Sequence, residues 1–184
     1  MKTKQLTLNP VSEYSICLLF FFYIASEVGY AAWIPTYAFK AQVANETQAS
    51  SLASIFWIVN TVARLLLLYW EGPVQYRLRV LLRALVACTI FVVILQALGF
   101  LKLVSYAGVI TSGTCLSAMY ALFFSMAIDF GYGLSPSNTA NFAMSASLGE
   151  GLLVMPIGYA MGFFGYKSLI VLIFLMSAIM LGLF

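Results

Sequence analysis

Two carboxylate side chains, Glu27 and Glu150, lie near the middle of long apolar stretches of this sequence. An ionisable group at bilayer depth costs about 2.5 to 3.5 kcal/mol on insertion scales, so a span that carries one generally uses it. Such a carboxylate can exchange a proton, bind Na⁺, or accept hydrogen bonds from a polar solute. The two residues therefore predict a path for a solute or an ion. The structural alternatives are a hydrogen bond from Glu27 to a neighbouring helix and close helix packing at the glycines that flank Glu150.

Aromatic side chains surround Glu27 at helical spacing. Tyr23 and Tyr30 are one turn away, and Trp33 and Tyr37 continue along nearby faces. Sugar hydroxyls donate hydrogen bonds to carboxylates, and the apolar faces of sugars stack on aromatic rings. The pattern therefore favours a sugar or a similar small polar solute.

Polar side chains in other apolar stretches complete the candidate site. We assign substrate binding to Glu27, Tyr30, Trp33, Asn60, Tyr120 and Asn141, and ion coupling to Glu27 and Glu150. Asn60 and Arg64 are one turn apart and could line one vestibule, but for Arg64 we favour an extended side chain that reaches the inner headgroups. For Asn141 and Tyr120, a bridge between helices is the alternative.

The elements that position these residues are transmembrane helices. Hydrophobic residues make up 63% of the chain, charged residues 8%, and the mean hydropathy is +1.00, which indicates an integral membrane protein without a separate soluble domain. Apolarity is continuous rather than alternating, which favours helices over strands. A span needs about 20 residues. We predict an all-α fold with one transmembrane domain over 1–184 and six helices, at 14–38, 50–70, 78–100, 103–128, 139–163 and 168–184.

The distribution of basic residues orients the helices. A cytoplasmic amino terminus places six basic residues inside and three outside, and six crossings return the carboxyl terminus to the cytoplasm. The inner set is Lys2, Lys4, Arg64, Arg77, Arg79 and Arg83, and the outer set is Lys40, Lys102 and Lys167. Asn45-Glu46-Thr47 then forms a glycosylation triplet in the first outer loop, although such triplets also arise by chance. The sequence does not indicate which membrane holds the protein.

Several function classes lack their signatures. There is no histidine, and Cys17, Cys88 and Cys115 have no metal-ligand spacing, so we expect no metal and no cofactor. Without a nucleophile elbow or a suitably placed base we also expect no enzyme activity. The net charge of +3 follows from topology and does not predict binding to nucleic acid.

Polarity is concentrated in the first, second, fourth and fifth predicted helices. In a two-times-three arrangement, these helices line a polar interior and the third of each triplet lies outside. Residues 117–123, 146–151 and 156–159 resemble the tenth and eleventh helices of major facilitator superfamily transporters. Residues 23–38 are similar to the seventh helix of its fucose:proton symporter and sodium-dependent glucose transporter branch, and Ala63-Arg64-Leu65 resembles the end of the eighth helix.

The resemblance implies the carboxyl-terminal six-helix half of such a transporter, built from two inverted three-helix repeats. The loop from Glu71 to Arg83 lacks the full basic motif of that superfamily. A lone half provides one wall of a cavity. We therefore predict a half-transporter for a sugar-like solute, driven by H⁺ or Na⁺, that requires a second six-helix half or a second copy. A ridge of Ala143, Ser147 and Gly151 is the candidate contact for that half. The alternative is an accessory subunit, packed among unrelated membrane subunits, that does not transport.

Overall fold

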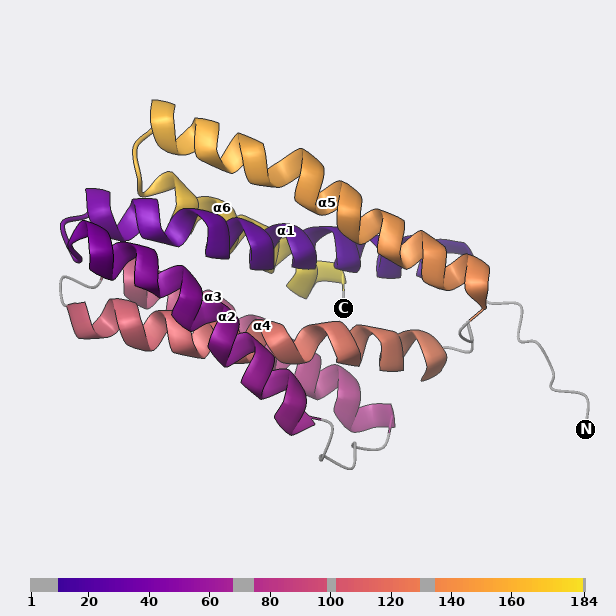
Figure 1. The fold of residues 1–184 in the computed structure, drawn as a ribbon. Helices are drawn as coiled ribbons and strands as arrows, with labels where there is room; N and C mark the ends of the chain where they lie inside the picture. The colour runs from indigo at the N-terminus through magenta and orange to yellow at the C-terminus, as the bar shows by residue number, and fades with distance from the viewer. Residues whose placement is uncertain (1–9, 68–74, 99–101, 130–134, 184) are drawn as a thin grey trace, which may run out of the picture.

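The computed structural model describes residues 10–67, 75–98, 102–129 and 135–183, and these form six α-helices without a strand (Figure 1). This confirms the predicted all-α fold class. Consecutive helices run in opposite directions, so α1 and α5 are parallel to each other. The helices are α1 (Pro10–Lys40), α2 (Glu46–Leu67), α3 (Gln75–Leu98), α4 (Lys102–Asp129), α5 (Pro136–Phe163) and α6 (Ser168–Leu183).

α2 and α5 begin earlier than predicted, and hydrogen bonds to Asn45 and Ser135 form at these earlier starts. α2 begins at Glu46 instead of position 50, because the Asn45 carbonyl accepts a hydrogen bond from the Ala49 amide at 2.7 Å. α5 begins at Pro136, where the Ser135 hydroxyl accepts from the Asn138 amide. Some predicted features lie outside the described residues. They are the helix ends at 70, 100 and 184, the loop 71–73 and the amino-terminal lysines.

Three helices of the described part are long and apolar enough to cross a membrane, within Glu13–Lys40, Glu46–Leu66 and Tyr106–Ile128. Two shorter apolar helices follow at Leu81–Gln96 and Ser168–Leu183. α5 is long enough at 28 residues but is not among these helices, since it contains several serine and asparagine residues as well as Glu150. The apolar helices indicate a membrane protein.

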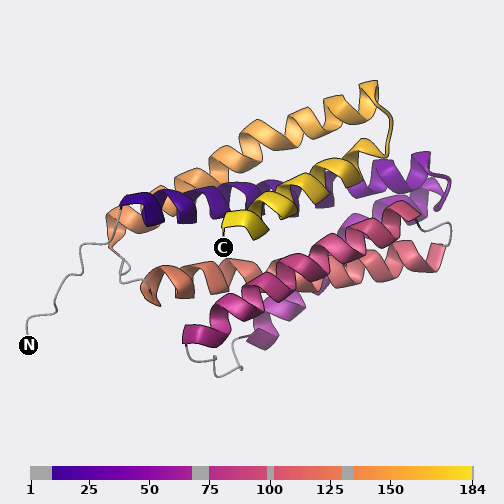
Figure 2. The ribbon, with the colours of Figure 1, turned by 180° about the vertical axis from the view of Figure 1, so that it is seen from behind.

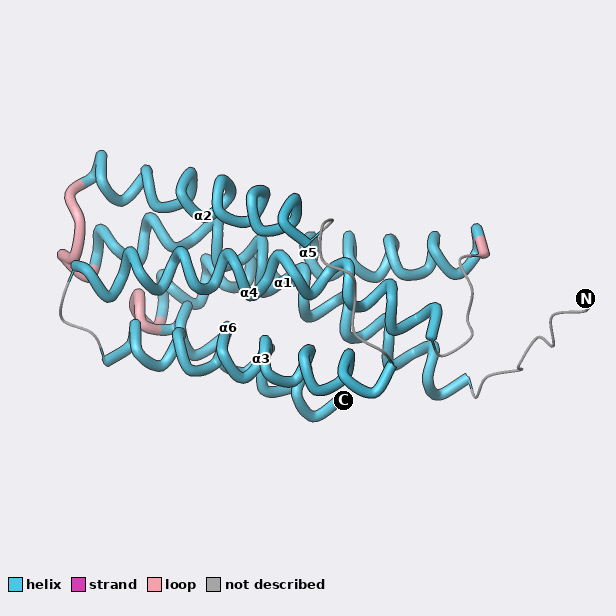
Figure 3. The backbone as a smooth tube through the Cα atoms, turned by 90° about the horizontal axis from the view of Figure 1, so that it is seen from below, coloured by secondary structure: helices cyan, strands magenta, loops and turns pink. Residues whose placement is uncertain are grey.

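The six helices form three layers. α3 and α6 lie together on one side of the molecule, as the view from behind shows (Figure 2). α2 and α5 lie on the other side, and α1 and α4 pack between the two layers (Figure 3). We call the side formed by α2 and α5 the α2/α5 face. The third helix of each predicted triplet is therefore peripheral, although α3 buries Thr89 and Gln96 toward the centre.

Helix pairing has partial internal symmetry. Exchanging α1 with α4, α2 with α5 and α3 with α6 converts the α1 contact with α5 into the α4 contact with α2. The same exchange converts the α1 contact with α6 into the α4 contact with α3. In the described residues, the contacts of α1 with α2 and of α5 with α6 have no counterparts. The packing is thus what two three-helix repeats would give, except at these two pairs.

The contact between α1 and α5 has a constant register. Glu13 meets Asn141, Phe21 meets Gly149 and Gly29 meets Ile157, and the two residues of each pair are 128 positions apart. A Cβ atom on Gly149 would collide with the backbone carbonyl of Phe21. The glycine therefore allows the two backbones to approach closely. This register fixes the depth of each α5 residue relative to α1.

Candidate functional site

Glu27 is the centre of the most highly bonded polar cluster in the described residues. Its side chain is buried, with 2% exposure. Oε1 accepts hydrogen bonds from Asn60 Nδ2 and from Arg64 Nη2, both at 2.6 Å. Oε2 accepts from the Tyr23 hydroxyl at 2.6 Å. Three donors from two helices therefore stabilise one buried carboxylate, which is the condition for a charge to remain in a low-dielectric interior.

Helical spacing positions these side chains. Tyr23 and Glu27 are four residues apart on α1, and Asn60 and Arg64 are four residues apart on α2. Each pair therefore lies on one side of its helix, and the packing of α1 against α2 brings the two pairs together. The same i, i+4 pattern is visible in the sequence, and it is the signal that would have added Tyr23 to the predicted site.

Arg64 points into the molecule, so the expected extension toward headgroups is wrong. Its guanidinium forms a salt bridge with Glu27 and lies 5.7 Å from the centroid of the Tyr120 ring. A charge-assisted hydrogen bond in a low-dielectric setting outweighs the headgroup interaction. The Arg64 side chain is nevertheless 43% exposed. It therefore connects the buried carboxylate to the surface of the helix bundle.

Tyr30 belongs to a second cluster. Its hydroxyl is fully buried and lies 2.7 Å from Nε2 and 2.9 Å from Oε1 of Gln96 on α3. The Tyr37 hydroxyl donates to the backbone carbonyl of Gln96 at 3.1 Å. Gly108 leaves the room that the Gln96 side chain occupies. The structure therefore places Tyr30 in a tyrosine–glutamine bridge between α1 and α3, separate from the hydrogen bonds of Glu27.

Two other predicted residues lie at the contact between α1 and α5. The indole nitrogen of Trp33 donates to the Val154 carbonyl at 2.8 Å, and a Cβ atom on Gly158 would collide with the indole ring. Asn141 donates to the Glu13 carboxylate at 3.2 Å. Trp33 also borders an open apolar groove of about 520 Å³, lined by Trp33, Met155, Gly158, Tyr159, Gly162 and Phe163. Neither Trp33 nor Asn141 is bonded to the Glu27 cluster.

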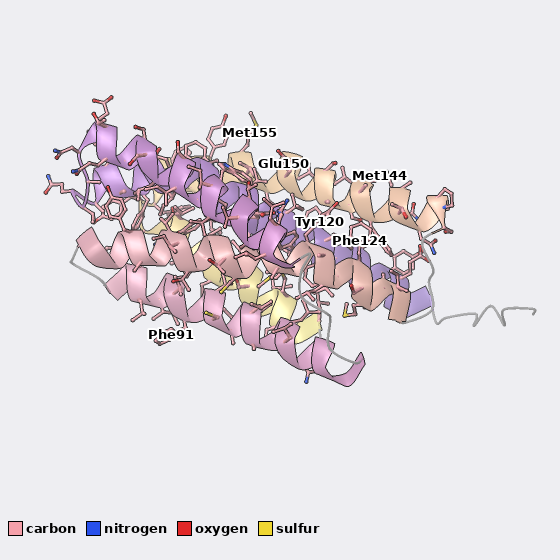
Figure 4. All side chains as sticks on the ribbon, turned by 60° about the horizontal axis from the view of Figure 1, so that its bottom comes forward. Phe91, Tyr120, Phe124, Met144, Glu150 and Met155 are labelled. Carbon is pink, nitrogen blue, oxygen red and sulfur yellow. The ribbon has the colours of Figure 1, made fainter. Side chains whose placement is uncertain are left out.

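Glu150 lies in a different environment. It falls in the stripe of α5 that contains Ala146, Ile157 and Met161, all of them buried, yet Glu150 itself is exposed. The α1–α5 register places Glu150 level with Phe22, about 7.5 Å along the helix axis from Glu27. Among described residues, Glu150 has neither a hydrogen bond nor a salt bridge. Figure 4 shows it midway along α5, between Met144 and Met155.

The arrangement suits hydrogen bonding better than metal binding. Within the described ranges, no group of three or more histidine, cysteine or acidic residues could hold a metal ion. The neighbours of the Glu27 carboxylate are all donors, and one of them is a cation. Of the predicted site residues, the structure brings together Glu27, Asn60 and Tyr120, the last through Arg64, and it leaves Tyr30, Trp33 and Asn141 outside this group.

Comparison with known proteins finds a distant similarity to a transporter. The chain is similar to the sodium-dependent glucose transporter 1 of Xenopus laevis, with 28% identity over 148 residues. The match covers 80% of this chain and 30% of that protein, so the chain corresponds to less than a third of its relative. No family model matches the chain, and no solved structure matches it. The relationship is distant, and it agrees with the predicted transporter resemblance.

Proposed function

We propose that this chain is one half of a secondary active transporter that moves a sugar or similar polar solute by ion-coupled alternating access. The buried ion pair of Glu27 and Arg64 near the middle of α1 is the observation that carries the proposal. An intramembrane charge pair with one partly exposed member is typical of a solute or ion path. The similarity to a protein named as a sodium-dependent glucose transporter supports the same class of solute.

In this proposal, Arg64 is the first contact for the solute. Its guanidinium is partly exposed, and its N–H groups can donate to sugar hydroxyls while the Tyr120 ring packs nearby. A solute that bonds to Arg64 competes with Glu27 for the same donors. Release from Arg64 would leave the buried Glu27 carboxylate without its counter-ion, and binding of H⁺ or Na⁺ there would restore the charge balance. Solute binding and ion binding are thereby coupled at one pair of side chains.

The two carboxylates would then have different roles. Glu27 is surrounded by three hydrogen-bond donors, one of them the Arg64 cation, which stabilise it as an anion while Arg64 holds it. Glu150 is exposed and free of donors, so a cation can approach it, whether H⁺ or Na⁺. We assign ion coupling to both residues.

The orientation in the membrane is also part of the proposal. Lys40 ends α1, and Lys167 lies between α5 and α6, at the same end of the bundle (Figure 1). The positive-inside rule favours this end as the outer one, because it has fewer basic residues than the other end, with both termini cytoplasmic. A second six-helix half, or a second copy, would supply the other wall of the cavity.

Reconstituted transport tests the proposal. The purified chain is placed in liposomes, and uptake of labelled hexoses is measured under an imposed H⁺ or Na⁺ gradient, with protein-free liposomes as the control. We expect gradient-dependent accumulation of at least one hexose. If none of the tested hexoses accumulates under either gradient, although folded protein is present in the liposomes, the proposal is wrong for this class of solute.

An accessory role is the second candidate, and the aromatic end of α5 favours it. Tyr159, Phe163 and Phe164 are 69%, 84% and 85% exposed, around the groove beside Trp33. A subunit that only packs against others could use this surface. Such a subunit would purify in a stable complex with unrelated membrane proteins, and replacement of Glu27 by glutamine would not change that complex or its activity.

A further inference from the structure

The α2/α5 face carries one basic and one acidic side chain on its two flanks. Arg64, on α2, is 43% exposed, and Glu150, on α5, is exposed as well. The α1–α5 register places Glu150 level with Phe22. Arg64 Nη2 lies 3.4 Å from the hydroxyl of Tyr23, the next residue along α1. The two charges are therefore at similar depth, within about one helical turn of each other.

This face is poorly suited to contact with lipid. Glu150 has no partner in the described part of the chain, and an unpaired carboxylate at bilayer depth is costly. The same flank exposes Ala143, Ser147 and Gly151, and a Cβ atom on Gly151 would meet nothing within 4 Å. Small side chains let another helix approach closely. We therefore expect this flank to contact protein rather than the acyl chains of lipids.

We propose that the cover is a second copy of this chain, related by a two-fold axis along the membrane normal. Such an axis preserves depth and exchanges the two flanks, so α5 of one copy faces α2 of the other. Glu150 then meets the partner's Arg64, and the contact occurs twice. A face with opposite charges on opposite flanks at similar depth is complementary to itself. This inference rests on the proposed function, since it names the partner that completes the cavity.

The pairing also connects the interface to the candidate site. Arg64 already bonds to Glu27 through Nη2, and its other N–H groups remain for a second acceptor. In the dimer, Arg64 lies between Glu27 of its own chain and Glu150 of its partner. Two carboxylates then compete for one guanidinium, so the charge on one carboxylate changes how strongly Arg64 binds the other.

Disulfide trapping between two tagged populations tests this geometry. In a background that lacks Cys17, Cys88 and Cys115, one population carries Thr61→Cys on α2 and the other carries Gly151→Cys on α5, both at exposed positions and at similar depth in the proposed dimer. The matched control pairs Phe91→Cys on α3 with Val171→Cys on α6, which are 60% and 54% exposed on the opposite side of the bundle. Figure 4 shows Phe91 pointing away from the bundle.

We expect native mass spectrometry to find about twice the 20.2 kDa chain mass, and oxidation to link the two tags in the test pair but not in the control pair. Glu150→Lys should lower the linked fraction at least about fivefold, whereas Glu150→Asp should retain most of it. A monomeric mass with linking no higher than in the control, or a different six-helix chain linked at position 151, overturns the inference.

The uptake assay separates this inference from the proposed function. Linked dimers that accumulate no sugar would support the dimer and contradict transport. Sugar uptake by a chain that fails the linking test would support transport and contradict the dimer.

Discussion

Glu27 and Glu150 lie on two parallel helices that pack in constant register, yet their surroundings differ in every respect. Glu27 is buried and accepts hydrogen bonds from Tyr23, Asn60 and Arg64. Glu150 is exposed and has no partner in the described residues. The difference comes from the neighbouring helices, because α2 packs against α1 at Glu27, whereas no helix of the described residues covers Glu150 on α5. A carboxylate within a span thus acquires its chemistry from what packs against it. The comparison predicts how substitutions at the two places should differ.

The largest loss of stability is expected from Arg64→Leu. This change leaves the Glu27 carboxylate buried without its counter-ion, which costs about 3 to 5 kcal/mol for a fully buried pair. Because Arg64 is 43% exposed, we expect about 3 kcal/mol, measured as the free energy of unfolding in detergent. Adding Glu27→Gln should recover part of the loss. Lys167→Leu, at an exposed position, is the control, and equal losses in both variants would contradict a stabilising ion pair.

Gly149→Leu should be next. The new side chain would collide with the Phe21 backbone, which cannot shift without separating α1 from α5. Overpacking of this kind costs about 1 to 3 kcal/mol, and we expect the upper half of that range. Gly151→Leu, two positions along α5, meets open space and should cost less than about 0.5 kcal/mol. Thermal unfolding of the two variants compares them directly, and a larger effect at position 151 would exclude the packing that fixes the depth of Glu150.

A smaller loss is expected from Asn60→Ala. The substitution removes one of the three donors to Glu27, while Arg64 and Tyr23 remain. Loss of a hydrogen bond to a buried charged group costs about 1.5 to 3 kcal/mol, and the remaining donors place the expected value near 1.5 kcal/mol. Ser54→Ala, at an exposed position of the same helix, provides the matched comparison. No difference between the two in denaturant unfolding would mean that Asn60 does not stabilise Glu27.

The smallest change in stability should follow Glu150→Gln. An exposed carboxylate without a partner contributes less than about 0.5 kcal/mol to folding. If the residue couples an ion, gradient-driven uptake should nevertheless fall about tenfold. Unfolding and uptake measured on one preparation separate the two effects. A strongly destabilised Glu150→Gln variant would remove the contrast with Glu27.

Apolar runs were enough to predict six helices, because a segment of continuous apolarity has one economical structure in a bilayer. The rotation of each helix could not be predicted in the same way. The packing of the helices directs Arg64 toward Glu27 and Tyr30 toward Gln96. Gly149 and Gly158 set the approach of α1 to α5, which takes Trp33 and Asn141 into that contact. The carboxylates were identified by their cost in lipid, whereas their partners depend on contacts between residues distant in sequence.

Uptake by Glu27→Gln is the measurement that tests the central claim most directly. The variant and its control Glu46→Gln, an exposed carboxylate at the start of α2, are compared with the unaltered chain in liposomes under the same gradient. If Glu27 and Arg64 form the working site, gradient-driven uptake by Glu27→Gln should fall at least about tenfold, and Glu46→Gln should match the unaltered chain. Full uptake by folded Glu27→Gln would contradict the account, because the buried ion pair would then be only structural.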